Sequence, residues 1–209
     1  MKKSISIAAF IALSTLATAA LSSAQAAEVR VANLASNAHK VDLWVGDKQV
    51  ASSVGSDAAS SFVDVGSGLQ KVMVTEAGTV YPIGVVDLNL DSSSQYTLVL
   101  VGDILLQTRL TPFQTQKVTP QSGQVALRVF NLANTQPSLE VSQVGNLTEG
   151  SAMAMAVTAS SSTLDVSFAG SSVDLTSTTP TLSTNTDVFV IDEGYIGNSP
   201  NLQTVTITE

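Results

Sequence analysis

The chain has no cysteine and only one histidine among its 209 residues. Without cysteine it forms no disulfide and carries no thiol for lipid attachment. Copper or zinc catalysis on a β-scaffold needs several histidines at each site, so one chain alone does not supply such a site. A metal-dependent enzyme of the superoxide dismutase type would require a metal shared between clustered chains.

Positive charge is also scarce, and no Lys or Arg follows Arg128. Without Lys2 and Lys3, seven basic residues remain against 17 acidic ones, a formal net charge of −10. Such a surface repels phosphate backbones and anionic lipid, which argues against nucleic acid and against direct membrane insertion after processing. The acidity suits cations, cationic surfaces or neutral polymers as partners, or it serves solubility alone.

The first 26 residues have the pattern of a signal peptide. Lys2 and Lys3 precede an apolar stretch over residues 5–21, and small residues at 24–26 form a cleavage site. We expect cleavage after Ala26 and an extracytoplasmic location: the periplasm, the cell envelope or the medium.

A short string repeats within the chain: Arg-Val-Ala-Asn-Leu-Ala at residues 30–35 returns as Arg-Val-Phe-Asn-Leu-Ala at 128–133. Further echoes follow in the same order, among them the run at 97–101, which is matched by the run at 187–191. A repeat of this length indicates one β-rich unit used twice. We therefore predict a signal peptide over 1–26, domain 1 over 27–118, a linker over 119–123 and domain 2 over 124–209.

Alternating apolar and polar residues between turn signals predict short strands throughout. Gly46 and Asp47 predict a two-residue hairpin turn with glycine first, as a type II′ turn requires. Eight short strands at regular spacing in domain 1 favour a β-sandwich. The expected strands of domain 1 cover residues 28–34, 41–45, 48–54, 62–65, 69–76, 83–90, 96–101 and 105–111.

Residues 29–47 read Val-Arg-Val-Ala-Asn-Leu-Ala-Ser-Asn-Ala-His-Lys-Val-Asp-Leu-Trp-Val-Gly-Asp. This stretch resembles the opening of DUF4397 domains, bacterial secreted or envelope modules of undefined function that usually occur in tandem. Asn33 stands where the family pattern has histidine. The resemblance implies an all-β fold of two tandem immunoglobulin-like antiparallel β-sandwich domains, and it implies no catalytic or cofactor-binding residues.

The single histidine, His39, lies beside Lys40 in an expected loop, and no Gly-x-Ser-x-Gly elbow accompanies it. We interpret it as an exposed loop residue rather than as part of a Ser-His-Asp triad, and it remains a weak candidate metal ligand.

Two acidic clusters are weak candidates for Ca²⁺ or another divalent metal. Asp87, Asn89 and Asp91 resemble the start of a calcium loop, but the glycine and the bidentate glutamate that should follow are missing. Their alternation with leucine indicates the solvated face of a strand. Asp192 and Glu193 form a comparable cluster in domain 2.

Trp44 is the only tryptophan. If exposed, it would suit stacking on a sugar ring or a protein partner, and if covered, it would belong to the core or to the contact between domains.

Arg30 and Arg128 recur at equivalent positions, and we predict that each pairs with the equivalent carboxylate of its own unit: Asp42 for Arg30 and Glu140 for Arg128.

We expect an exported, non-enzymatic module of the cell envelope, a structural or adhesive subunit that binds an envelope or surface-layer protein or a polysaccharide. Self-association is an additional possibility, since domain 2 has no lysine to guard its edge strands. The alternatives are the metal-dependent enzyme and a carrier of a small ligand, which would need a cavity between the two units.

Overall fold

The computed structural model describes eight stretches of the chain: residues 26–36, 39–103, 107–133, 138–141, 145–160, 166–168, 182–196 and 199–208. These stretches are all-β and contain no helix, so none of them holds a helix that is long and apolar enough to cross a membrane.

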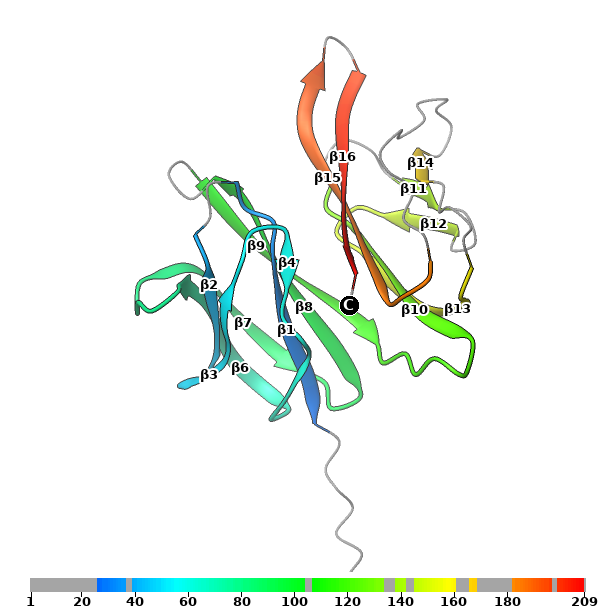
Figure 1. Cartoon of the computed structure of the whole chain (residues 1–209). Coiled ribbons are helices and arrows are strands. Elements are labelled where there is room, and N and C mark those ends of the chain that lie inside the picture. Colours follow the sequence, from blue (N-terminus) through cyan, green and yellow to red (C-terminus); the bar gives the residue numbers. More distant parts are fainter. Residues whose placement is uncertain are drawn as a thin grey trace, which may run out of the picture.

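Within the described stretches, the N-terminal half contributes nine strands: β1 (Ala27–Asn33), β2 (Val41–Val45), β3 (Lys48–Val54), β4 (Ala58–Ala59), β5 (Val63–Val65), β6 (Gly68–Glu76), β7 (Pro82–Leu90), β8 (Ser94–Asp103) and β9 (Gln107–Gln116). The C-terminal half contributes β10 (Gln124–Asn131), β11 (Ser138–Val141), β12 (Gly145–Thr148), β13 (Ala152–Thr158), β14 (Val166–Phe168), β15 (Thr186–Ile196) and β16 (Ser199–Thr208). The two halves lie side by side (Figure 1).

The strands that the structure describes form four sheets. Sheet A has the order β4-β1-β8-β9, with β5 also pairing with β1, and sheet B has the order β3-β2-β6-β7. Sheet C has the order β13-β10-β15-β16, and sheet D has the order β12-β11-β14. The expectation of purely antiparallel sheets is wrong in two places, because β1 pairs with β8 and β10 with β15 in parallel. In both halves the first strand thus lies beside a strand from late in the same half.

Strict alternation along β1 and β10 explains how the sheets stack. Val29 and Val31 of β1 join a core shared with sheet B, whereas Ala32 faces the C-terminal half. In β10, Val129 packs into the core of the C-terminal half, and Phe130 faces the N-terminal half. Because both faces of these strands are covered, their residues are buried almost without interruption.

Most sequence-predicted strands of the N-terminal half match the structure. The strands at 41–45 and 48–54 agree at both ends, and Gly46 between them has a φ of 57°, the positive sign that a type II′ turn needs at that position. The two-residue strand β4 was not predicted, because two alanines carry no alternation. The ninth strand begins at residue 107 instead of 105, and residues 104–106 lie outside the described stretches.

Tyr96 fixes the corner between β7 and β8. Its ring is buried, and its hydroxyl accepts a hydrogen bond from the amide of Asp91 (2.9 Å) and donates one to the carbonyl of Asn89 (3.3 Å). The side chain of a residue in one sheet thereby holds the backbone at the end of the other sheet.

We expect Gly102→Ala to destabilise the N-terminal half by about 2–4 kcal/mol. Gly102 has a φ of +101°, and an added Cβ would lie 2.3 Å from the carbonyl oxygen of Gln107. The matched control is Gly55→Ala, where φ is not positive and nothing lies within 4 Å of the added atom. Urea unfolding of both variants measures the difference in their free energies of unfolding. Equal stabilities would contradict the close approach of Gly102 on β8 to Gln107 on β9.

Candidate functional site

A buried ion cluster joins the two halves. One Nη of Arg30 lies 2.5 Å from Asp187, and one Nη of Arg128 lies 3.1 Å from the other carboxylate oxygen. The side chains of Arg30 and Asp187 are fully buried, and that of Arg128 is nearly so. One carboxylate of the C-terminal half is therefore shared by two guanidinium groups, one from each half.

The two parallel ladders place these groups in register. Arg30 lies opposite Thr97 in the β1–β8 ladder, and Arg128 lies opposite Asp187 in the β10–β15 ladder. Arg30 donates from Nε to the hydroxyl of Thr97 at 3.0 Å. The two units thus have equivalent arginines, but only the second has a carboxylate at the facing position.

Phe62, in the segment between β4 and β5, covers both guanidinium groups. The centroid of its ring lies 4.2 Å from the Cζ of Arg30 and 5.0 Å from the Cζ of Arg128. Both distances fall within the range of a cation–π attraction, which is stronger away from water.

An apolar cluster surrounds the ions on the same interface. Phe130 stacks on Phe189 with centroids 4.6 Å apart, and the edge of Phe113 from the N-terminal half meets Phe130 at 5.5 Å. The buried members of this shared cluster come from both halves: Ala32, Leu34, Val99, Val101, Phe113, Phe130, Leu132, Phe189 and Ile207. The halves are therefore held together by a buried apolar core as well as by charge.

Glu28 extends the charged network toward solvent. It faces the same side of β1 as Arg30, accepts a hydrogen bond from Gln95 at 2.6 Å and pairs with Lys117. Partial burial opposes ionisation of Glu28, but the bonds from Gln95 and Lys117 and the charges of Lys117 and Arg128 outweigh it, so the pKa of Glu28 lies below its ordinary value. The bond to Glu28 in turn raises the pKa of Lys117, although slight desolvation opposes this.

The predicted pairs of Arg30 with Asp42 and of Arg128 with Glu140 are wrong. Asp42 points to the outer face of sheet B. There its carboxylate accepts hydrogen bonds from the backbone amides of Ser53 (2.8 Å) and Gly78 (3.0 Å). Glu140 lies exposed on β11. The alternation of β1 and β10 turns both arginines toward the opposite half, where neither carboxylate lies.

The repeated asparagines have a structural role. The amide of Asn33 donates to the carbonyls of His39 and Val54, both at 3.3 Å, and that of Asn131 donates to the carbonyl of Leu147 at 3.0 Å. Both side chains are buried, and each ties the strand end to the following loops. In each half, the repeated string therefore supplies an arginine that contacts Asp187 at the interface between the halves and an asparagine that binds later backbone carbonyls.

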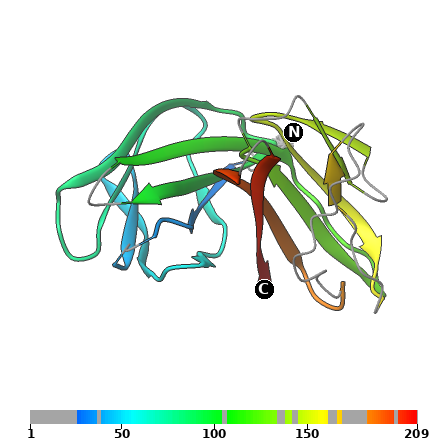
Figure 2. The same ribbon diagram turned by 90° about the horizontal axis from the view of Figure 1, so that it is seen from above.

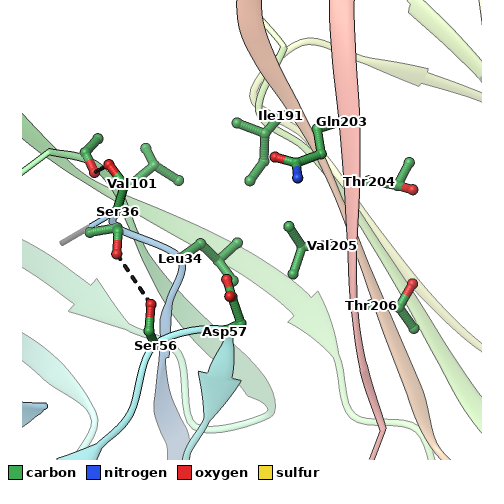
Figure 3. A pocket seen from close by; sticks show the side chains of 12 residues that line it. Leu34, Ser36, Ser56, Asp57, Val101, Ile191, Gln203, Thr204, Val205 and Thr206 are labelled. Atoms are coloured by element: carbon green, nitrogen blue, oxygen red, sulfur yellow. Dashed lines mark hydrogen bonds between the residues drawn. The ribbon is translucent and has the colours of Figure 1, made fainter. Parts of the chain in front are cut away.

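A cleft of about 590 Å³ opens beside the shared cluster (Figure 3). Its N-terminal wall comes from the ends of β1 and β8 and the turn before β4, and its C-terminal wall from β15 and β16. Figures 1 and 2 both place β16 on the side of the C-terminal half that faces β1 and β4. Apolar side chains alternate in the lining with hydroxyls and one amide: Leu34, Val101, Ile191 and Val205 with Ser36, Ser56, Gln203, Thr204 and Thr206. Among the described residues of this lining, Asp57 is the one that carries a charge.

A second surface lies on the outer face of sheet B. Trp44, Met73 and Val85 are cross-strand neighbours on β2, β6 and β7, and Leu69 lies two positions before Lys71 on the same face. Val85 is 46% exposed and Leu69 is 77% exposed. We refer to Trp44, Leu69, Met73 and Val85 as the outer-face patch.

Trp44 therefore lies neither in a core nor between the halves. It is partly exposed, and its indole nitrogen donates to the hydroxyl of Thr75 at 3.2 Å, which fixes the ring on the sheet.

Those sequence-predicted metal candidates that the structure describes do not form a metal-binding group. His39 is exposed in the loop before β2. Asp87 and Asn89 are exposed on the outer face of β7, in agreement with a solvated strand face, while Asp91 accepts bonds from the amide and hydroxyl of Ser93 in the next turn. Asp192 and Glu193 lie in β15, but their side chains are outside what the structure describes. Within the described residues, no three His, Cys, Asp or Glu side chains are grouped to hold a metal ion.

The profile of DUF4397, described as a domain of unknown function, matches residues 27–142. This match covers more than half of the chain and continues past β10 into the C-terminal half. The chain belongs to the DUF4397 family. Comparison with curated proteins gives no match.

We expect Asp187→Asn to lower the free energy of unfolding by about 3–5 kcal/mol, because it leaves two buried guanidinium groups without their shared carboxylate. Urea unfolding, followed by Trp44 fluorescence for the N-terminal half and by circular dichroism for the whole chain, measures the loss. The two probes should also separate, since the halves lose their common charge pair.

Glu140→Gln is the matched control for Asp187→Asn. Glu140 is the carboxylate that the sequence pattern favoured, and it is exposed, so its neutralisation should change stability by no more than about 0.5 kcal/mol. Equal effects of the two substitutions would contradict the role of Asp187.

Loss of the Lys117 ammonium should make the protein more sensitive to acid. Because the folded-state pKa of Glu28 is lowered, its ionisation stabilises the fold above the unfolded pKa of about 4.3, and this contribution is lost as the pH falls through the folded pKa. In Lys117→Met the pKa of Glu28 rises, so this loss begins at a higher pH. Urea unfolding between neutral and acidic pH measures the shift, and Lys40→Met, which removes an exposed charge elsewhere, should show none.

Proposed function

We propose that this protein is an exported, non-enzymatic module of the cell envelope. It consists of two immunoglobulin-like sandwiches in tandem and acts as a structural or adhesive subunit that binds another envelope or surface-layer component, either a protein or a polysaccharide. The pattern of residues 1–26, with its basic start, apolar stretch and small-residue site, supports export.

The packing supports the immunoglobulin-like architecture. Sheets A and B enclose one core between them, and sheet C with β11 and β12 of sheet D encloses another. A tyrosine whose hydroxyl bonds to the backbone a few residues upstream is a hallmark of that architecture, and Tyr96 makes this contact with Asn89 and Asp91.

The observation that carries the proposal is the buried contact between the two halves. Separating them would expose the phenylalanine cluster and leave Arg30 without its carboxylate. Such a contact transmits force and holds the outward surfaces of the two halves at a fixed angle. This suits a structural subunit better than a function that requires the two domains to move relative to each other.

We infer that the C-terminal half makes the contact with the envelope component. The edges of sheet C are β13, which contacts β9 of the N-terminal half, and β16, which contains no lysine. Lysine commonly protects sheet edges against association with other chains, so the edge at β16 is suited to strand-to-strand docking.

The cleft favours a second candidate, a carrier of a small ligand. Its volume of about 590 Å³ lies in the range of small-molecule sites, and its lining combines apolar side chains with hydroxyls. The ligand would be uncharged or cationic, with hydroxyl or amide groups, because the described lining residues include Asp57 and no basic residue.

One experiment separates these functions. The full-length protein with a C-terminal tag is recovered from its native envelope in mild detergent, and the eluate is examined by native mass spectrometry and by metal analysis. We expect a stoichiometric envelope protein or polysaccharide and no tightly bound metal. A lone chain with an added mass of a few hundred daltons would favour the carrier, and tightly bound copper, zinc or calcium would favour an enzyme. Either of these results contradicts the envelope module.

A further inference from the structure

The cleft between the halves reaches the edge of a sheet. Its lining includes four consecutive residues of β16, from Gln203 to Thr206, and β16 ends the order of sheet C in the described part of the chain. A site on the flat face of a strand would involve alternate residues, because successive side chains point to opposite faces. Four consecutive residues therefore indicate that the cleft follows the edge of the strand.

The side chains of β16 agree with this placement. Val205 packs against the shared apolar cluster, and Figure 3 shows Val205 and Gln203 turned toward the N-terminal wall of the cleft. Thr204 and Thr206 are cross-strand neighbours of valines in the core of the C-terminal half, and the figure shows both threonines turned away from the cleft. At these two positions the cleft therefore meets the main chain of β16.

The edge of β16 has the geometry for a further strand. In an antiparallel ladder, alternate residues direct their N–H and C=O groups to the neighbouring strand, and the residues between them direct theirs to the other side. β16 pairs with β15 on one side, so a chain that enters the cleft meets the other side. Gln203 to Thr206 span about 10 Å at about 3.3 Å per residue, a length that an extended segment of about four residues matches.

Asp57 places a negative charge in this cleft. Its φ of 53° and the hydrogen bond from its amide to the carbonyl of Asn33 (2.8 Å) fix the turn before β4, and its side chain is exposed. No described hydrogen bond or ion pair uses its carboxylate. The described lining residues include no basic group, so the charge that complements Asp57 has to come from the bound molecule, as a lysine or arginine side chain.

The N-terminal wall favours a peptide over a sugar or a small polar molecule. The hydroxyl of Ser36 donates to the carbonyl of Gly102 (3.2 Å), and that of Ser56 donates to the carbonyl of Ala35 (3.4 Å). Both hydroxyl protons are therefore used within the wall. The described lining also has no aromatic side chain on which a sugar ring could stack. Its apolar members suit the alternate side chains of an extended peptide.

We propose that the cleft binds an extended peptide segment of the envelope component, which joins sheet C as an added strand beside β16. The segment places apolar side chains against Leu34, Val101 and Val205 and a lysine or arginine against Asp57. Main-chain hydrogen bonds supply affinity in this mode of binding, and the side-chain contacts supply the sequence preference. The inference rests on the proposed envelope function and narrows its partner to a protein with an exposed extended segment.

Peptide selection on the purified protein tests the site. Random peptides of about nine residues, the length of a long strand, are displayed on phage, selected on the wild type and then synthesised. We expect sequences in which apolar residues alternate and a lysine or arginine is present. N-methylation of alternate peptide amides should weaken binding at least about tenfold, because it removes the hydrogen bonds to β16.

Asp57→Asn tests the charge in the cleft. It should weaken binding of the selected peptides about tenfold and leave circular dichroism unchanged, because asparagine adopts a positive φ as readily as aspartate. The matched control is Asp47→Asn, which neutralises an exposed carboxylate in the turn between β2 and β3 and should leave the affinity unchanged. Selected peptides that tolerate both Asp57→Asn and N-methylation would overturn the proposal.

A photo-reactive side chain in place of Gln203 tests the site in the native envelope, with the same group in place of Ser61, exposed outside the cleft, as the control. We expect position 203 alone to capture a protein, through a segment that contains a basic residue. Capture of a polysaccharide or a small molecule there would overturn the inference. A protein partner that is recovered with the tagged chain but never captured at position 203 would also overturn it and leave the envelope function standing. Failure to recover any partner would contradict the envelope function, whereas Asp57-dependent peptide binding would still support the cleft as a peptide site.

Discussion

The structure depends on one carboxylate with two partners. Asp187 is fully buried, and burial of an ionised group is tolerated only where opposite charge and hydrogen bonds surround it. Arg30 and Arg128 have the same need, and in the described part of the chain the carboxylate that Arg30 contacts belongs to the other half. The three side chains can therefore be buried only together, which makes the contact between the halves a condition of the fold rather than an addition to it.

This requirement organises the neighbouring layers. Alternation along β1 sends Arg30 to the same side as Ala32, and alternation along β10 sends Arg128 to the same side as Phe130. The faces that carry the arginines thereby also carry the apolar residues that exclude water from them. The ring of Phe62 covers both guanidinium groups. The ion pair between Glu28 and Lys117 extends the charged network to the surface.

Much of the fold can be read from the sequence, because alternation is a local property. Val41, Leu43 and Val45 alternate with polar or amphipathic residues, so the boundaries of β2 follow directly. The partner of Arg30 was missed because Asp187 lies 157 residues later in a different unit, and repetition suggested a partner inside each unit. The parallel ladders and the outward position of Trp44 likewise depend on which strands become neighbours, and local pattern does not determine this. The cleft beside β16 depends on the packing of the two halves, so no single segment of the sequence carries a signal for it.

The parallel pairing of β1 has a consequence for the order of folding. β1 pairs with β8, whose residues lie 67 positions later in the chain. Arg30 of β1 forms its ion pair with Asp187, which lies near the end of the chain. During synthesis, most of the polypeptide must leave the ribosome before the first strand can complete its contacts. Such a topology has a high contact order and folds slowly, so the newly made chain spends an interval without fixed tertiary structure. A secretion apparatus that accepts only unfolded polypeptides would be able to bind the new chain during this period.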